Sequence, residues 1–96
     1  MLECSVIILN WNGEAMLRRY LPSVIQYTQL EGVEIVVADN GSTDASLEFL
    51  HSQPVRIIEL GENLGFAEGY NRAIEQVESK YVVLLNSDVE VTSNWL

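Results

Sequence analysis

Polar side chains gather at four places along the chain, each directly after a short apolar run. These segments are Leu9-Asn10-Trp11-Asn12-Gly13, Ala38-Asp39-Asn40-Gly41-Ser42, Glu62-Asn63-Leu64-Gly65 and Leu85-Asn86-Ser87-Asp88. Their amides, carboxylates and indole ring can hydrogen-bond, bind a cation or stack on a flat ligand. If the apolar runs are parallel strands, the four segments lie along one rim of a sheet, where such folds bind ligands. They therefore form one candidate site.

Two of these segments carry carboxylates at strand ends. Asp39 could reach a donor on a base or ribose, or it could simply cap the next helix. Asp88 and Glu90 are two residues apart and share a side of an extended chain. Oxygen ligands of this kind suit Mg²⁺ or Mn²⁺, whose remaining coordination comes from substrate phosphates and water. Two interpretations stay open: Asp88 binds a divalent cation, or these residues form a solvated acidic loop.

The other candidates are an indole ring, two glycines and an arginine. Trp11 could stack on a nucleobase or cover the edge of the core. Gly65 and Gly69 could let the backbone approach a diphosphate or allow close helix packing. Arg72 could contact a diphosphate or pair with a neighbouring glutamate. The phosphate-binding fingerprints of P-loop and dinucleotide-binding proteins are not met.

Asn40-Gly41-Ser42 is typical of a turn, because Asn and Gly tolerate left-handed backbone and Ser caps helices. The single histidine, His51, falls at a helix end away from the predicted rim. These residues are therefore not placed in the candidate site.

Composition limits the classes of partner. The chain has 96 residues and a formal net charge of -9, with 14 acidic and 5 basic residues. A nucleic-acid partner is not expected, because phosphate contacts need clustered Lys and Arg. The lone cysteine, Cys4, excludes an internal disulfide and reads as a buried thiol. No apolar run approaches a membrane span of roughly 18 residues, and no signal peptide is evident. We expect a cytoplasmic protein, with the inner face of the membrane as the alternative place for the full-length protein.

Apolar periodicity indicates seven elements. Mainly apolar runs predict strands over Ser5–Leu9, Val33–Ala38 and Tyr81–Leu85, and a more alternating run predicts a strand over Val55–Leu60. Three- and four-residue spacing predicts helices over Glu14–Tyr27, over a short stretch that includes Ala45–Leu50, and over Phe66–Val77. Ser42 or Thr43 is expected to cap the second helix, and Pro22 to kink or shorten the first. Phe66 is expected on the buried stripe of the third helix.

This alternation predicts an α/β fold, a Rossmann-like parallel sheet with helices on both faces. Strand order 3-2-1-4 would place a switch point between the first and fourth strands. Asn94-Trp95-Leu96 looks like the start of another helix, so we expect residues 1–96 to be part of a longer domain. The fourth strand would then expose an apolar edge, which favours self-association into a homo-oligomer.

The four motifs, in this order and spacing, resemble the N-terminal half of family 2 glycosyltransferases. The residues that carry the resemblance are Val6–Gly13, Glu34–Asp44, Asn63–Asn71 and Leu84–Val91, so it covers essentially the whole chain. It implies a GT-A fold that binds a nucleotide-sugar donor. The Asn86-Ser87-Asp88 form together with Asn-Leu-Gly-Phe-Ala is similar to bacterial rhamnosyltransferase-like members.

The resemblance implies roles for seven residues. Trp11 matches a base-stacking position with Asn10 and Asn12 beside it, and Asp39 matches the acid that hydrogen-bonds the base. Gly65 and Asn71 match the segment beneath the ribose and diphosphate. Asn86-Ser87-Asp88 matches the Asp-x-Asp metal motif of the family, with Asp88 as the ligand of Mg²⁺ or Mn²⁺. Asn86 stands where the family has its first acid, and this departure lowers the expected metal affinity.

The implied activity is inverting transfer of a sugar from a UDP- or dTDP-linked donor to a saccharide or lipid-linked acceptor, in cell-envelope polysaccharide synthesis. The family's catalytic base and most of its acceptor site lie downstream of the metal motif. Residues 1–96 alone are therefore expected to bind nucleotide without efficient transfer. The alternative is a non-catalytic α/β module that binds a nucleotide or a protein partner. Metal-dependent nucleotide binding through Asp88 separates the two.

Overall fold

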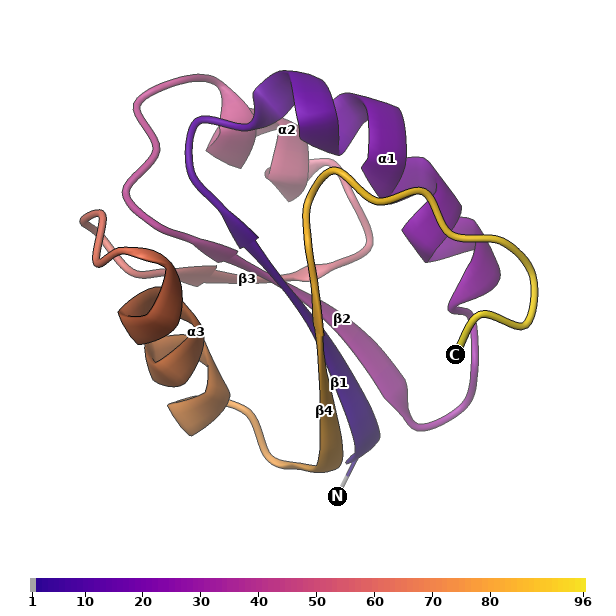
Figure 1. The fold of residues 1–96 in the computed structure, drawn as a ribbon. Coiled ribbons are helices and arrows are strands. Elements are labelled where there is room, and N and C mark those ends of the chain that lie inside the picture. Colours follow the sequence, from indigo (N-terminus) through magenta and orange to yellow (C-terminus); the bar gives the residue numbers. More distant parts are fainter. Residues whose placement is uncertain (1) are drawn as a thin grey trace.

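The computed structural model describes residues 2–96, and Met1 lies outside the described residues. Strands and helices alternate along the chain (Figure 1). Their bounds are β1 Leu2–Asn10, α1 Glu14–Tyr27, β2 Val33–Asp39, α2 Ser46–His51, β3 Arg56–Glu59, α3 Phe66–Glu75 and β4 Ser79–Leu85. All seven predicted elements are present, and the predicted bounds of α1 are those observed.

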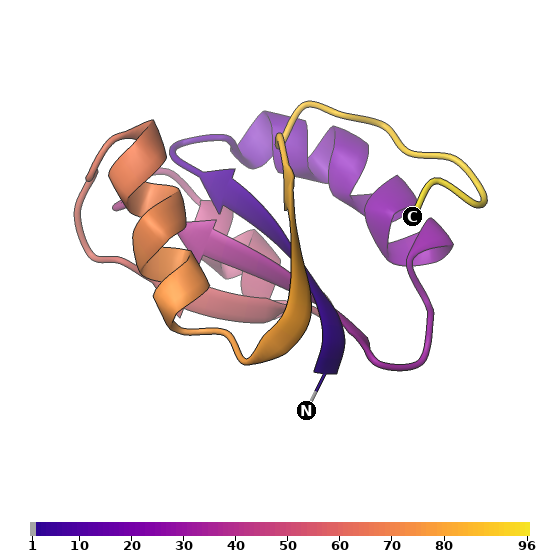
Figure 2. The same cartoon turned by 60° about the horizontal axis from the view of Figure 1, so that its bottom comes forward.

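The four strands form one parallel sheet in the order β3-β2-β1-β4, which confirms the predicted order. Helices α1 and α2 cover one face of the sheet and α3 covers the other (Figures 1 and 2). The architecture is the Rossmann-like α/β fold that the alternation predicts. The register aligns Asn10 with Asp39 at the carboxyl ends of β1 and β2, so the first two motifs meet at one rim.

Each face of the sheet has its own apolar cluster, because neighbouring residues of a strand point to opposite faces. Under α1 and α2, Ile8 and Val37 pack with Leu17, Leu21, Val24, Leu50 and Val91. Under α3, Ile7 and Val36 pack with Ala38, Ile58, Tyr70 and Ala73. Val6, Ile7 and Val36 have no exposed surface. This two-sided burial explains why the central strands are apolar at nearly every position.

Helix α1 continues through Pro22 to Tyr27, so it does not end early at the proline. Pro22 is exposed, and the buried neighbours Leu21 and Val24 hold the helix on the sheet. Packing of this apolar face offsets the loss of one backbone hydrogen bond.

Residues 86–96, which follow β4, contain no helix, and the helix expected to start at Asn94 stays a prediction. They run alongside α1 as an irregular segment, drawn in yellow in Figure 1. The Val91 amide donates to Ser23 Oγ at 3.1 Å, and Trp95 Nε1 donates to Thr28 Oγ1 at 2.9 Å. These two bonds, together with the burial of Val91, hold the segment against α1 in a non-helical path.

β4 lies at the edge of the sheet, with β1 as its partner among the described residues. Tyr81 and Leu84 on this strand are 58% and 50% exposed, as expected of an uncovered apolar edge. Phe66 is 67% exposed, so its expected place on the buried stripe of α3 is wrong. Its ring makes an edge-on contact with Tyr70 instead, with centroids 4.9 Å apart. No helix within residues 2–96 is long and apolar enough to cross a membrane.

Candidate functional site

The centre of the candidate site is the pair Asn10 and Asp39, which the sheet register places side by side. Asn10 Nδ2 donates to Asp39 Oδ1 at 3.0 Å, and the two residues are 1% and 2% exposed. Asp39 also accepts from Ser42, through its hydroxyl at 2.6 Å and its backbone amide at 3.0 Å. Three donors therefore satisfy a buried carboxylate that would be costly to bury alone.

Ser42 connects this pair to the loop that follows β1. Its hydroxyl oxygen accepts from Asn10 Nδ2 at 3.2 Å and from the Asn12 backbone amide at 2.9 Å. It therefore bonds three residues of the rim and does not cap α2, contrary to expectation. Thr43 is not the cap either, because α2 begins at Ser46 after Ala45, without a side-chain cap.

Asn12 joins the loop after β1 to the loop after β2. Its backbone is left-handed, with φ at 49°, a conformation that Asn tolerates better than most residues. Its Oδ1 accepts from the backbone amides of Thr43 at 2.7 Å and Asp44 at 3.2 Å. Among the described residues, the side-chain oxygen of Asn12 therefore accepts its hydrogen bonds from the loop after β2.

Asp44 adds a further link between these loops. Its carboxylate accepts from the backbone amides of Glu14 at 3.2 Å and Ser46 at 2.9 Å. Desolvation acts to raise the pKa of this carboxyl. The hydrogen bonds from Ser46 and Glu14 outweigh it, so the pKa lies below its usual value.

Asn40 ties the third motif to the rim. Its side chain is 2% exposed, and its Oδ1 accepts from the Leu64 amide at 2.9 Å. Its Nδ2 donates to Asn63 Oδ1 at 3.2 Å and to the Gly65 carbonyl at 3.1 Å. The turn-like composition of residues 40–42 concealed this role, and no spacing pattern in the sequence signals it.

Two glycines allow close approaches at the rim, and a third leaves open space there. A Cβ on Gly41, at φ of +79°, would lie 2.7 Å from the Glu62 backbone. A Cβ on Gly69 would lie 2.9 Å from Leu9 Cδ1, so Gly69 serves the close helix packing considered as its alternative role. Gly65 differs, because its φ is +82° and no atom lies within 4 Å of a Cβ built there. Gly65 therefore presents open backbone at the rim.

The Asn10 side chain carries one unused acceptor. Its Oδ1 is buried and has no hydrogen-bond partner among the described residues. A Cβ on Gly13 would lie 2.5 Å from this oxygen, so the missing side chain of Gly13 leaves room beside it. A buried acceptor without a donor is rare in native proteins and commonly belongs to a functional site.

Trp11, Asn71 and Asp88 are exposed, and no hydrogen bond in residues 2–96 joins their side chains to this network. Asp88 follows β4, whose carboxyl end lies beside that of β1. No group of three or more potential metal ligands occurs within the described residues. A lone carboxylate nevertheless fits Mg²⁺ or Mn²⁺ where phosphates and water complete the coordination. Arg72 pairs with Glu68 at 3.5 Å, as its alternative reading predicted.

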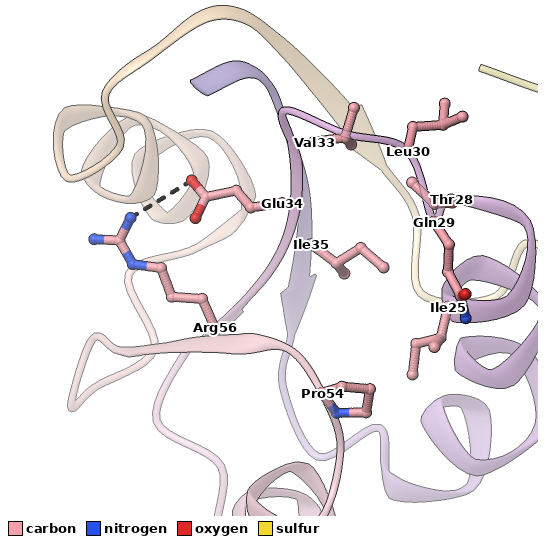
Figure 3. Close-up of a pocket in the computed structure, with 9 residues that line it drawn as sticks. All are labelled: Ile25, Thr28, Gln29, Leu30, Val33, Glu34, Ile35, Pro54 and Arg56. Atoms are coloured by element: carbon pink, nitrogen blue, oxygen red, sulfur yellow. Dashed lines mark ion pairs between the residues drawn. The ribbon is translucent and has the colours of Figure 1, made fainter. Parts of the chain in front are cut away.

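A separate hollow of about 310 Å³ lies near the amino end of β2 (Figure 3). It is lined by Ile25, Thr28, Gln29, Leu30, Val33, Glu34, Ile35, Pro54 and Arg56. The two charged residues already form an ion pair at 3.5 Å, and Glu34 also accepts from Ser5 at 2.6 Å. The candidate site residues lie at the opposite end of the sheet, so this hollow is not part of the site.

Comparison with known proteins identifies the family. The model of Glycosyl transferase family 2 matches residues 5–96. The teichoic acid poly(glycerol phosphate) polymerase of Staphylococcus epidermidis is 29% identical over 95% of this chain and 13% of its own length. Uncharacterized glycosyltransferase YfnE of Bacillus subtilis is 34% identical over 92% of this chain and 24% of its own. The chain thus spans at most a quarter of these two relatives.

Solved structures share the fold. S. aureus TarS 1-349 superposes with a TM-score of 0.82 at 26% identity, covering 95% of this chain and 29% of the 1-349 chain. TarS in complex with UDP-GlcNAc gives a TM-score of 0.79 at 27% identity, covering 91% and 27%. Mannosyltransferase PcManGT from Pyrobaculum calidifontis gives 0.81 at 21% identity, covering 95% and 29%. The matched model shows that the chain belongs to glycosyl transferase family 2, and the sheet order and the structural likenesses show that it has the GT-A type of α/β fold.

Proposed function

We propose that this chain is the donor-binding part of an inverting glycosyltransferase, which transfers a sugar from a nucleotide diphosphate to a saccharide or lipid-linked acceptor. The observation that carries the proposal is the hydrogen-bonded rim in which Ser42 and Asn40 join three of the four motifs. Membership of the family supports a nucleotide sugar as the ligand of that rim.

The base of the donor is assigned to the carboxyl ends of β1 and β2. Trp11 is 54% exposed, which leaves its ring free to stack on a base. Asp39 keeps acceptor capacity beyond its three donors, and the unused Oδ1 of Asn10 can accept from a ligand N–H. Asn12 is assigned to the same subsite, chiefly by holding the loop that carries Trp11.

The ribose and diphosphate are assigned to the segment that includes Gly65 and Asn71. The open space beside Gly65 supports this assignment, because a backbone without a side chain can approach phosphate oxygens closely. Asp88 would hold the divalent cation, which supplies positive charge for the departing diphosphate. The chain has few other sources of such charge, since it carries only 5 basic residues against 14 acidic ones.

The transfer itself needs a general base that removes a proton from the acceptor hydroxyl. No residue of this chain is assigned that task, since the family resemblance places the base downstream of Asp88. Direct attack by that hydroxyl on the anomeric carbon, with departure of the diphosphate, inverts the configuration there. The role of residues 2–96 in this step is to bind and orient the donor.

Of the two candidate donors, a UDP-sugar is proposed in preference to a dTDP-sugar. TarS, whose sequence is 27% identical over 91% of this chain, has been solved with UDP-GlcNAc. The likeness of the Asn86-x-Asp88 motif to rhamnosyltransferase-like members favours a dTDP-sugar and stays a prediction. Direct comparison of UDP with dTDP decides between them.

The test is calorimetric titration of UDP and dTDP into the protein at its natural full length, with Mn²⁺ and with EDTA. Asp88→Ala should lose the metal-dependent part of the affinity. The matched control is Glu78→Ala, which removes the same charge from an exposed residue just before the amino end of β4 and should bind like the unaltered protein. Metal-independent binding that Asp88→Ala does not change would refute the role of Asp88. Absence of binding in the folded protein would favour the non-catalytic alternative.

A further inference from the structure

Asn40 occupies a position between the base end and the phosphate end of the proposed donor site. Its backbone amide donates to the Asn10 carbonyl at 2.7 Å, which fixes it to the end of β1. Among residues 2–96, its side-chain amide bonds only to the Asn63-Leu64-Gly65 turn, through one accepted and two donated hydrogen bonds. A single residue therefore connects the strand ends to that turn.

The turn is packed closely against the end of β2 on a second side. The absence of a side chain on Gly41 lets the Glu62 backbone approach to within 2.7 Å of where a Cβ would be. Helix α3 approaches Asn40 as well, because a Cβ on Gly69 would lie 3.1 Å from Asn40 Nδ2. The position of the turn and of the start of α3 thus depends on the Asn40 amide.

Gly65, which Asn40 holds by a hydrogen bond, is also the residue of the turn that has open space beside it. The Gly65 carbonyl accepts from Asn40, and the Gly65 amide donates to Asn63 Oδ1 at 2.9 Å. On its Cα side Gly65 has no atom within 4 Å of a built Cβ. Asn63 Oδ1 therefore receives two donors, from Asn40 and Gly65, and stiffens the turn at the position that faces the open space.

We propose that Asn40 is a positioning residue that fixes the Asn63–Gly65 turn for the phosphates of the donor, whereas Ser42 fixes the base end. This inference rests on the proposed function. The two residues lie two positions apart, yet their side chains bond to different loops, Asn40 to the turn before α3 and Ser42 to residues 10–12. Their loss should therefore affect different parts of the ligand.

The experiment compares UDP with uridine, which lacks the diphosphate, in the natural full-length protein. If the unaltered protein prefers GDP or dTDP, that nucleotide and its nucleoside replace the pair. Asn40→Asp keeps the acceptor for Leu64 but turns the Nδ2 donor into an oxygen that faces two acceptors. Asn63→Ala weakens the same turn from an exposed position and serves if Asn40→Asp does not fold.

Two further variants complete the design. Ser42→Ala tests the base end of the site. Arg56→Met is the control for a general loss of stability, since Arg56 donates to the Gln76 carbonyl at 2.9 Å and pairs with Glu34 at the other end of the sheet. It should leave both affinities unchanged.

We expect Asn40→Asp and Asn63→Ala to weaken UDP about tenfold while uridine changes less than about twofold, the scale of one or two lost hydrogen bonds. Ser42→Ala should weaken both ligands by the same factor. Equal effects of Asn40→Asp on UDP and uridine, or no effect on either, would overturn the inference. Failure of the unaltered protein to bind any of these nucleotides would instead overturn the proposed function on which it rests.

Discussion

Replacing Gly41 by alanine tests whether the loops after β2 and β3 meet as closely as described. The new Cβ would lie 2.7 Å from both Cα and the carbonyl carbon of Glu62, whereas ordinary contact begins at 3.4 Å. The turn must therefore retreat by about 0.7 Å. That displacement strains the hydrogen bonds between Asn40 and the turn, because they span the same gap.

Two costs add at this position. Left-handed backbone costs a non-glycine residue about 1–2 kcal/mol, and overpacking against neighbouring atoms costs about 1–3 kcal/mol. We expect Gly41→Ala to lower the free energy of unfolding by about 2–5 kcal/mol. This is a large share of the roughly 5–15 kcal/mol that stabilises a typical domain.

The matched control is Gly61→Ala, whose φ of +84° is similar but whose Cβ would meet no atom within 4 Å. Both variants change the unfolded chain equally, so the difference between them isolates the steric cost. Equilibrium urea denaturation should place Gly41→Ala about 1–3 kcal/mol below Gly61→Ala. Equal stability of the two variants would refute the close approach of the loops.

Three further predictions concern the open backbone, the buried thiol and the C-terminal segment. Gly65→Ala and Gly61→Ala should lose similar stability, but only Gly65→Ala should weaken UDP in calorimetry, because its Cβ enters the proposed phosphate space. Burial, and to a lesser extent the charge of Glu3, raises the pKa of the Cys4 thiol above its usual value. The contribution of this thiol to the free energy of unfolding is therefore complete below the usual thiol pKa and is lost as the pH rises through the folded pKa. Cys4→Ala should remove this part of the pH dependence in urea denaturation under alkaline conditions. Trp95→Phe should cost about 1 kcal/mol in urea denaturation by removing a half-buried hydrogen bond, whereas Trp11→Phe should cost less than about 0.5 kcal/mol.

The sheet and its helices were predictable because their signals extend over many residues. The apolar spacing of α1 predicts its first and last residues, Glu14 and Tyr27, although Pro22 lies between them. The strand order follows from the handedness of parallel crossovers together with the analogy to nucleotide-binding halves. The meeting of Asn10 and Asp39 follows in turn, because strands of this order end at one rim.

The links between loops were not predictable, because each depends on one side chain meeting a residue far along the chain. Ser42 is a residue type that commonly caps helices, yet its hydroxyl donates to Asp39 and accepts from the backbone amide of Asn12. Asn40 looks like a turn residue, yet its partners begin 23 positions later. Trp95 bonds to the hydroxyl of Thr28, 67 positions earlier in the chain, and no local pattern signals that contact.

The central position of β1 has a consequence for synthesis of the protein. Leu2 pairs with Ser79, so the strand on one side of β1 is made 77 residues after it. At about 5–20 residues per second, that edge of β1 waits roughly 4–15 seconds for its partner on the ribosome. Its apolar run from Val6 to Ile8 is an aggregation hazard during this interval. Early pairing with β2, whose last residue is Asp39, shields only the other edge, so correct folding depends on protecting the nascent chain until β4 emerges.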